Sequence, residues 1–146
     1  MAKKKDLHAL IRLRKWEVDE KQRALGLLLR EEERVIARQT ALEQSLVQER
    51  AFVAKAEPSQ RVTFEAFVRR CMAAREALER ELFEVMKKIA LAQLDLAEAF
   101  RRLKTFEISQ RQRDLEALKE EERLEQLTLD EVGLTLHRRK ADGAAL

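Results

Sequence analysis

Apolar side chains recur every seven residues along two long stretches of the chain, and most positions between them are charged. The first stretch carries two such series, which are Ile11, Val18, Leu25, Glu32, Gln39, Leu46, Val53 and Leu7, Arg14, Lys21, Leu28, Val35, Leu42, Glu49. The second stretch carries two longer ones, which are Val68, Arg75, Leu82, Ile89, Leu96, Leu103, Gln110, Ala117, Leu124, Glu131 and Phe64, Cys71, Leu78, Val85, Ala92, Ala99, Phe106, Arg113, Glu120, Leu127, Leu134. A strict seven-residue period predicts a left-handed coiled coil, because it keeps one stripe facing a partner helix. We call this stripe the seam.

The strongest break in the pattern is Glu57-Pro58-Ser59, since proline inside a helix removes a backbone donor and clashes with the preceding turn. Ser59 and Thr63 are candidate N-caps of the helix that follows. The expected organisation is a single domain with a basic flexible N-terminus (1–6), a first helix (7–55), a turn (56–63), a second helix (64–138) and a flexible tail (139–146). The predicted fold class is therefore all-α: two long helices in an antiparallel coiled-coil hairpin, with the second helix longer. Leu7 should lie opposite about residue 113, and the residues beyond about 114 should overhang.

A second apolar face lies opposite the seam near the chain ends. In the first stretch it consists of Leu13, Trp16, Ala24 and Leu27, and in the second of Ile108, Leu115, Leu118, Leu129, Val132 and Leu136. The same face in the middle of the first stretch is mostly polar or small. Apolar residues on the water-facing side of a coiled coil indicate a docking surface, and Trp16 is the best single anchor. The alternative is intramolecular: the overhang could fold back, or a third helix could form.

Near the turn, Phe64, Phe67 and Val68 cluster with Cys71 and Met72. This cluster is interpreted either as packing of the hairpin tip or as a second partner site. Cys71 is the only cysteine and stands on the seam, so we expect a small core residue in a reducing compartment.

Composition argues against an enzyme. Charged residues make up 39% of the chain, with 3 Gly and 1 Pro, which is typical of long helices and leaves no Gly-rich phosphate loop. His8 and His137 have no partners at metal-ligand spacing, and no Ser, Cys or His arrangement suggests a nucleophile. We therefore expect no catalytic residue, metal, cofactor or small-molecule substrate. The net charge of +3 comes from densely mixed signs, so nucleic acid is not an expected partner; the run Lys3-Lys4-Lys5 leaves an anionic membrane surface as an alternative.

Three stretches resemble the family of the flagellar type III export protein FliJ, the coiled-coil stalk of the export ATPase. They are the opening Leu7-His8-Ala9-Leu10-Ile11-Arg12-Leu13-Arg14-Lys15 with Glu17 and Glu20, then Arg102-Leu103-Lys104-Thr105-Phe106-Glu107 with Arg111 and Arg113, and finally Glu125-Gln126 with Leu129-Asp130-Glu131. The length, the hairpin layout and the position of the turn also agree over nearly the whole chain.

The resemblance implies a rod whose paired chain ends insert into the pore of the hexameric export ATPase. It implies further contacts with the membrane-embedded export gate and with export chaperones, at the inner face of the cell membrane. The ATPase-binding residues would be Leu13, Trp16, Leu129, Asp130 and Glu131, with Leu27 and Val132 added from the outer apolar face; the gate-binding residues would be Phe64, Phe67 and Cys71. A stalk of a virulence type III secretion system and a self-assembling coiled-coil scaffold are the alternatives.

Overall fold

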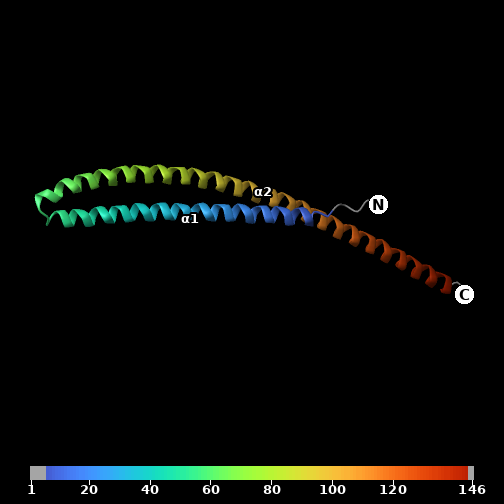
Figure 1. The fold of residues 1–146 in the computed structure, drawn as a ribbon. Helices are drawn as coiled ribbons and strands as arrows, with labels where there is room; N and C mark the ends of the chain where they lie inside the picture. The colour runs from blue at the N-terminus through green and yellow to red at the C-terminus, as the bar shows by residue number, and fades with distance from the viewer. Residues whose placement is uncertain (1–5, 145–146) are drawn as a thin grey trace. The chain divides into compact units, whose positions relative to one another are not determined.

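The computed structural model describes residues 6–144, and within that range it consists of two helices, α1 (His8–Val53) and α2 (Pro58–Ala144) (Figure 1). The helices are antiparallel and contact each other, and α2 has 87 residues against 46 in α1. The predicted all-α hairpin with a longer second helix is thus confirmed. The expected basic run Lys3-Lys4-Lys5 lies outside the described residues.

The connection between the helices is shorter than the expected turn at 56–63. Helix α1 closes with i→i+3 bonds from the amides of Lys55 and Ala56 to the carbonyls of Phe52 and Val53, at 3.2 and 3.1 Å. Such tightened bonds satisfy the last carbonyls of a helix without a glycine cap. Pro58 then opens α2, where its fixed φ suits the first helical position and its missing amide proton costs nothing.

Helix α2 is longer at both ends than expected, and two expectations from the sequence are therefore corrected. Ser59 and Thr63 lie inside α2 and are not its N-caps, because the helix begins at Pro58 and not at residue 64. At the other end, α2 continues as far as Ala144, through most of the segment expected as a tail from 139. Gly143 does not stop the helix, since glycine is a costly but tolerated helical residue.

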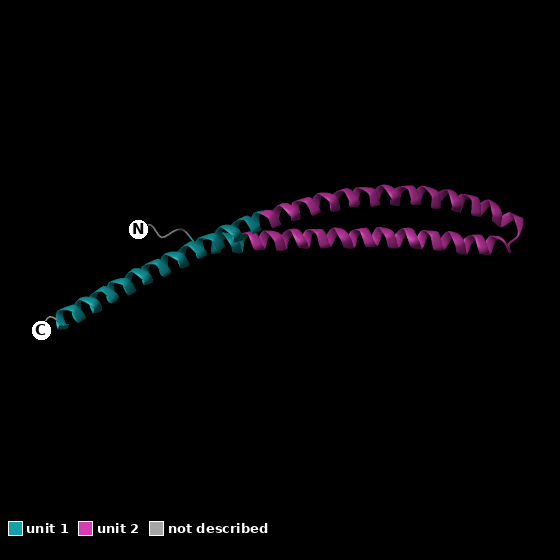
Figure 2. Ribbon diagram, turned by 180° about the vertical axis from the view of Figure 1, so that it is seen from behind, with its two compact units in different colours: residues 1–13, 102–146 teal, residues 14–101 magenta. Residues whose placement is uncertain are grey.

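By its internal contacts the chain forms two units (Figure 2). The hairpin unit comprises residues 14–101, and the terminal unit comprises residues 1–13 together with 102–146. The buried apolar residues of the hairpin unit are Val18, Val35, Leu46, Cys71, Leu78, Val85, Ile89 and Ala99. All of them belong to the predicted seam series, so the seven-residue stripe forms this thin core.

Ion pairs across the hairpin unit keep the two helices in register. Arg38 donates to both carboxylate oxygens of Glu81 at 3.0 and 3.1 Å, and Arg75 reaches Glu43 at 2.6 Å. Arg75 is one of the polar seam positions, and its side chain leaves the seam to meet a carboxylate on the other helix. Because both pairs are exposed, each contributes only about 0–1 kcal/mol, and the apolar seam supplies most of the stability.

Candidate partner-binding surfaces

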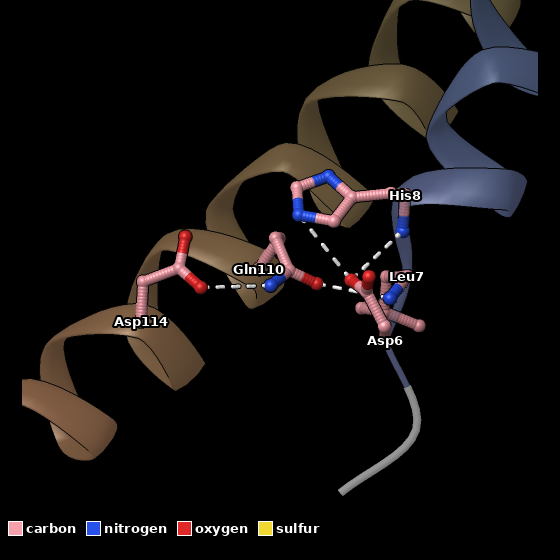
Figure 3. A network of polar contacts seen from close by, with 5 residues as sticks. All are labelled: Asp6, Leu7, His8, Gln110 and Asp114. Atoms are coloured by element: carbon pink, nitrogen blue, oxygen red, sulfur yellow. Dashed lines mark hydrogen bonds and ion pairs between the residues drawn. The ribbon is translucent and has the colours of Figure 1, made fainter.

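A polar contact between the helices fixes the beginning of α1 in the terminal unit (Figure 3). The backbone amide of Leu7 donates to Oε1 of Gln110 on α2 at 2.9 Å, and Gln110 Nε2 donates to Asp114 Oδ1 at 2.8 Å. The next amide, that of His8, is capped locally by Asp6 Oδ1 at 3.2 Å. Two of the amides that a helix start leaves without intrahelical partners are therefore satisfied. Leu7 lies opposite residue 110, close to the expected residue 113.

Beyond this contact, α2 continues with no partner helix among the described residues. Every residue from 114 to 144, the segment that we call the overhang, is exposed. Figure 2 shows this end of α2 as a helix with no second helix beside it. The seam series continues there with Leu124, Leu127 and Leu134, and the second apolar face continues with Leu115, Leu118, Leu129, Val132 and Leu136. The overhang therefore presents apolar side chains on two sides of one helix about 45 Å long. It does not fold back, and no third helix forms in the described part of the chain.

The predicted ATPase-binding residues are all on the surface. In the hairpin unit Trp16 is 58% exposed and Leu27 is also exposed; in the terminal unit Leu13 is exposed. On the overhang Leu129 is 64% exposed, and its neighbours Asp130, Glu131 and Val132 are exposed too. Asp130 accepts a hydrogen bond from Gln126 Nε2 at 3.1 Å. Each of these side chains is available to a partner, and the apolar ones would lose contact with water on docking.

The tip of the hairpin unit carries an open groove with a volume of about 340 Å³. Its lining includes Phe52 from α1 and Phe64 and Phe67 from α2. The rings of Phe64 and Phe67 stack on each other with their centroids 6.5 Å apart. Cys71 lies one turn further along α2 but is buried in the seam. Of the three predicted gate-binding residues, the structure therefore brings two to a surface groove and places the third beneath the surface.

A larger hollow of about 610 Å³ lies in the terminal unit, beside the start of α1. All but one of its lining residues are of polar or charged type, with Asp6, His8 and Gln110 at the helix contact and Asp114 and Glu120 on the overhang. Glu120 also binds Arg123 one turn further on, with Nη2 to Oε1 at 2.7 Å and Nε to Oε2 at 3.1 Å. That hydrogen bond, helped by the charge of Arg123, lowers the pKa of Glu120 despite an opposing contribution from desolvation.

Exposed apolar residues occur away from the chain ends as well, although the outer apolar face was expected only near the ends. The middle of α2 exposes Phe83, Met86, Leu91 and Leu94 in the hairpin unit. The ammonium of Lys87 lies 4.5 Å from the centre of the Phe83 ring and partly covers it. A heptad count on the outer positions of the second stretch could have found these residues, because they also recur at helical spacing. Exposure alone therefore does not single out a docking face, whereas the overhang is distinguished further by the lack of a partner helix among the described residues.

No group of three or more His, Cys, Asp or Glu side chains that could hold a metal ion occurs in residues 6–144. Over the same range, no helix is long and apolar enough to cross a membrane.

Comparison with protein families shows to which family the chain belongs. The family described as "Flagellar FliJ protein" has a model that matches residues 3–142, nearly the whole length. The chain belongs to the FliJ family. A search of the curated proteins and a search of the solved structures each gave no significant match.

The predicted family resemblance is thereby confirmed, and it assigns this FliJ-family chain to flagellar protein export. The family is a structural export component. The match spans both helices, including the overhang and the tip groove. In this FliJ-family chain the surfaces described above are therefore candidates for contacts within the export apparatus.

Proposed function

We propose that this chain is a non-enzymatic stalk of the hexameric flagellar export ATPase, with its chain ends inserted into the pore of the ring. The observation that carries the proposal is the overhang: a continuous helix in which every residue is exposed and apolar side chains occupy two sides. A helix with one apolar side suits one partner helix. A helix with two such sides suits a partner that surrounds it, as the subunits of a ring do.

The contacts with the ring would come from Leu13, Trp16, Leu27, Leu129, Asp130, Glu131 and Val132. The apolar members would enter pockets between subunits, and the carboxylates of Asp130 and Glu131 would pair with cations that line the pore. The stalk carries no hydrolytic group of its own. It would change the turnover of the ATPase by binding some conformations of the ring more tightly than others.

The decisive experiment measures binding to the purified hexameric ATPase and its rate of ATP hydrolysis. Trp16→Ala and Leu129→Ala should each weaken binding about tenfold or more, since a buried aromatic or aliphatic anchor often contributes 2 kcal/mol or more. The matched control is Val47→Ala, because Val47 is 65% exposed against 64% for Leu129 but lies 20 residues beyond Leu27 on α1, toward the tip of the hairpin unit. Circular dichroism checks that each variant remains helical.

Three results would count against the stalk role. The wild-type chain could fail to bind the ATPase, the two variants could act like wild type, or Val47→Ala could weaken binding as much as Leu129→Ala. The last result would mean that any exposed aliphatic residue matters equally and that the chain ends have no special role.

The tip groove supports a second contact, with the membrane-embedded export gate, which would place the chain in the cytoplasm at the inner face of the cell membrane. Phe64 and Phe67 would receive an apolar side chain of the gate protein, and Cys71 would hold them in place from the seam. Phe67→Ala should reduce capture by the cytoplasmic part of the gate, whereas Phe83→Ala should not. Equal effects of the two substitutions would remove the groove from the proposal. Export chaperones are further proposed partners, through family membership and not through any particular residue.

A further inference from the structure

The overhang has a strongly uneven distribution of charge along its length. Residues 114–131 contain eight carboxylates and two cations, whereas residues 132–144 contain three cations and one carboxylate. The cations are consecutive, at Arg138, Arg139 and Lys140. A helix that is acidic in its first part and basic in its last part is complementary to itself when two copies run antiparallel, and not when they run parallel.

The seam positions of the overhang select one antiparallel register. If the two-fold axis passes at residue 129, the seam pairs are Leu124 with Leu134, Glu120 with Arg138, Ala117 with Ala141 and Leu127 with Glu131 of the other copy. Leu124 then meets Leu134, and the only cation on the overhang's seam meets a carboxylate, whereas Leu127 and Glu131 form the one mismatched pair. Each pair forms twice because of the symmetry.

Other alignments are worse for identifiable reasons. A parallel in-register pair would place Glu120, Glu131 and Arg138 each against its own copy, so three seam layers would hold like charges. Sliding the antiparallel pair by one heptad places Glu120 opposite Glu131 in one direction. In the other direction it places Leu127 opposite Arg138. The first slide creates a like-charge layer, and the second loses both the Leu124–Leu134 and the Glu120–Arg138 pairs. The register centred on residue 129 is therefore the most favourable of the three, although it retains the Leu127–Glu131 pair.

The length of the overhang fits the same register. The last seam residue of α2 that is even partly buried within the chain is Arg113, and exposure is complete from 114 to 144. With the axis at residue 129, the second copy's Ala144 comes opposite position 114. The second copy would thus cover the seam from the point where α1 ceases to cover it.

We infer that free chains pair through their overhangs as a symmetric antiparallel coiled coil, with Glu120 of each copy bound to Arg138 of the other. In the single chain Glu120 binds Arg123 instead, and both groups are exposed, so this pair must open or be shared when the dimer forms. Only a few leucines per copy enter the seam, so the association is weak and reversible. The dimer would use the same surface of the overhang that is assigned above to the ATPase, so dimerisation and binding to the ATPase exclude each other. The dimer does not depend on that assignment.

Sedimentation equilibrium of the full chain, from about 1 µM to about 500 µM, tests the dimer over a range that covers weak association. Wild type should pass from monomer to dimer. Glu120→Arg and Arg138→Glu should each weaken the dimer about tenfold or more, because each replaces two attractive contacts by two repulsive ones. The double variant E120R/R138E should restore it. Glu122→Arg makes the same charge change off the seam and should leave the dimer intact.

Cross-linking with a short bis-maleimide fixes the orientation, in a background in which Cys71→Ala removes the natural thiol. Thr128→Cys should link two copies efficiently, because residue 128 lies beside the two-fold axis. Ala117→Cys should not, because in the antiparallel pair the two copies of residue 117 are about 36 Å apart. A chain that stays monomeric throughout the range overturns the inference. So does a double variant that fails to recover, or efficient linking through residue 117. None of these results bears on binding to the ATPase, which is measured separately.

Discussion

The hairpin unit and the overhang carry the same seven-residue stripe but differ completely in burial. In the hairpin unit the stripe is covered, and Val35 is only 1% exposed. In the overhang the seven-residue period continues, with Glu120 and Glu131 between the apolar positions, yet Leu127 is 48% exposed. The difference shows that the repeat encodes readiness to pair, whereas burial depends on whether a second helix is present. The covered stripe therefore stabilises the hairpin unit, whereas the exposed stripe of the overhang has no helix to pack against within the described chain.

The largest expected effect that separates the two regions comes from placing a charge on the stripe. Val35→Asp should destabilise the chain by about 3–5 kcal/mol, because it buries a carboxylate with no partner. Leu127→Asp makes a comparable change in the overhang and should cost about 0.5 kcal/mol, mainly through the weaker helix propensity of Asp. Thermal unfolding followed by circular dichroism, at a concentration where the chain is monomeric, measures both. Similar losses of stability from the two substitutions would contradict the comparison.

A medium effect is expected at Gln110, where the covered part of the stripe ends. Gln110→Ala removes the hydrogen bond to the Leu7 amide and leaves that amide without its acceptor, at a cost of about 1–2 kcal/mol. Amide hydrogen exchange should speed up at the start of α1. Gln126→Ala is the control. Gln126 donates a hydrogen bond to the aspartate four residues further on, Asp130, as Gln110 does to Asp114, but Gln126 has no described hydrogen bond to the other helix. Unchanged exchange in Gln110→Ala would mean that Leu7 and Ile11 hold this end by packing alone.

A smaller effect is expected from Gly133, which lies in the overhang. A Cβ added there would meet nothing within 4 Å, so Gly133→Ala should raise the helicity and stabilise the segment by up to about 1 kcal/mol. Gly26→Ala is the matched control in the hairpin unit, where the space is equally open. Backbone order parameters from NMR should rise in the overhang only for Gly133→Ala. A partner that approaches the helix closely at residue 133 would bind this variant less well.

The smallest effect concerns the ion pair of Glu120 and Arg123. Since the pair lowers the pKa of Glu120, its contribution to the helix is present above the ordinary pKa of glutamate and is lost as the pH falls through the lowered value. Arg123→Gln should raise the pKa of Glu120, as followed by NMR titration of its carboxyl carbon. Arg139→Gln removes the same charge elsewhere on the helix and should leave Glu120 unchanged. High salt should reduce the shift, because the pair is in solvent.

The seam was the most predictable feature of the fold. Every buried residue of the structure belongs to the four seven-residue series, including the polar Gln110. The seam can be predicted because the same contact between two helices repeats every seven residues in a coiled coil, so apolar residues recur at that spacing in the sequence. The helix ends were less predictable. Proline breaks the interior of a helix but is equally suited to open one, as Pro58 does, and the tail expected from residue 139 is helical as far as Ala144.

The candidate surfaces were only partly predictable. The outer apolar residues Trp16 and Leu129 were found from their spacing, because a water-facing position that is apolar violates the pattern around it. Phe83 and Leu94 violate the pattern equally, so helical spacing alone does not separate the docking candidates near the chain ends from other exposed apolar residues. Which exposed residues a partner touches depends on the partner's surface, and that information is not in this sequence. The bond from Leu7 to Gln110 likewise depends on where α1 begins relative to α2.

Trp16 gives the chain a built-in optical reporter. It is the only tryptophan, there is no tyrosine, and its indole is more than half exposed. Nearly all near-ultraviolet emission therefore comes from one known position, free of energy transfer from neighbouring phenols. A shift of that emission to shorter wavelength upon mixing with a tryptophan-free partner would report that the indole has left water, with no dye attached.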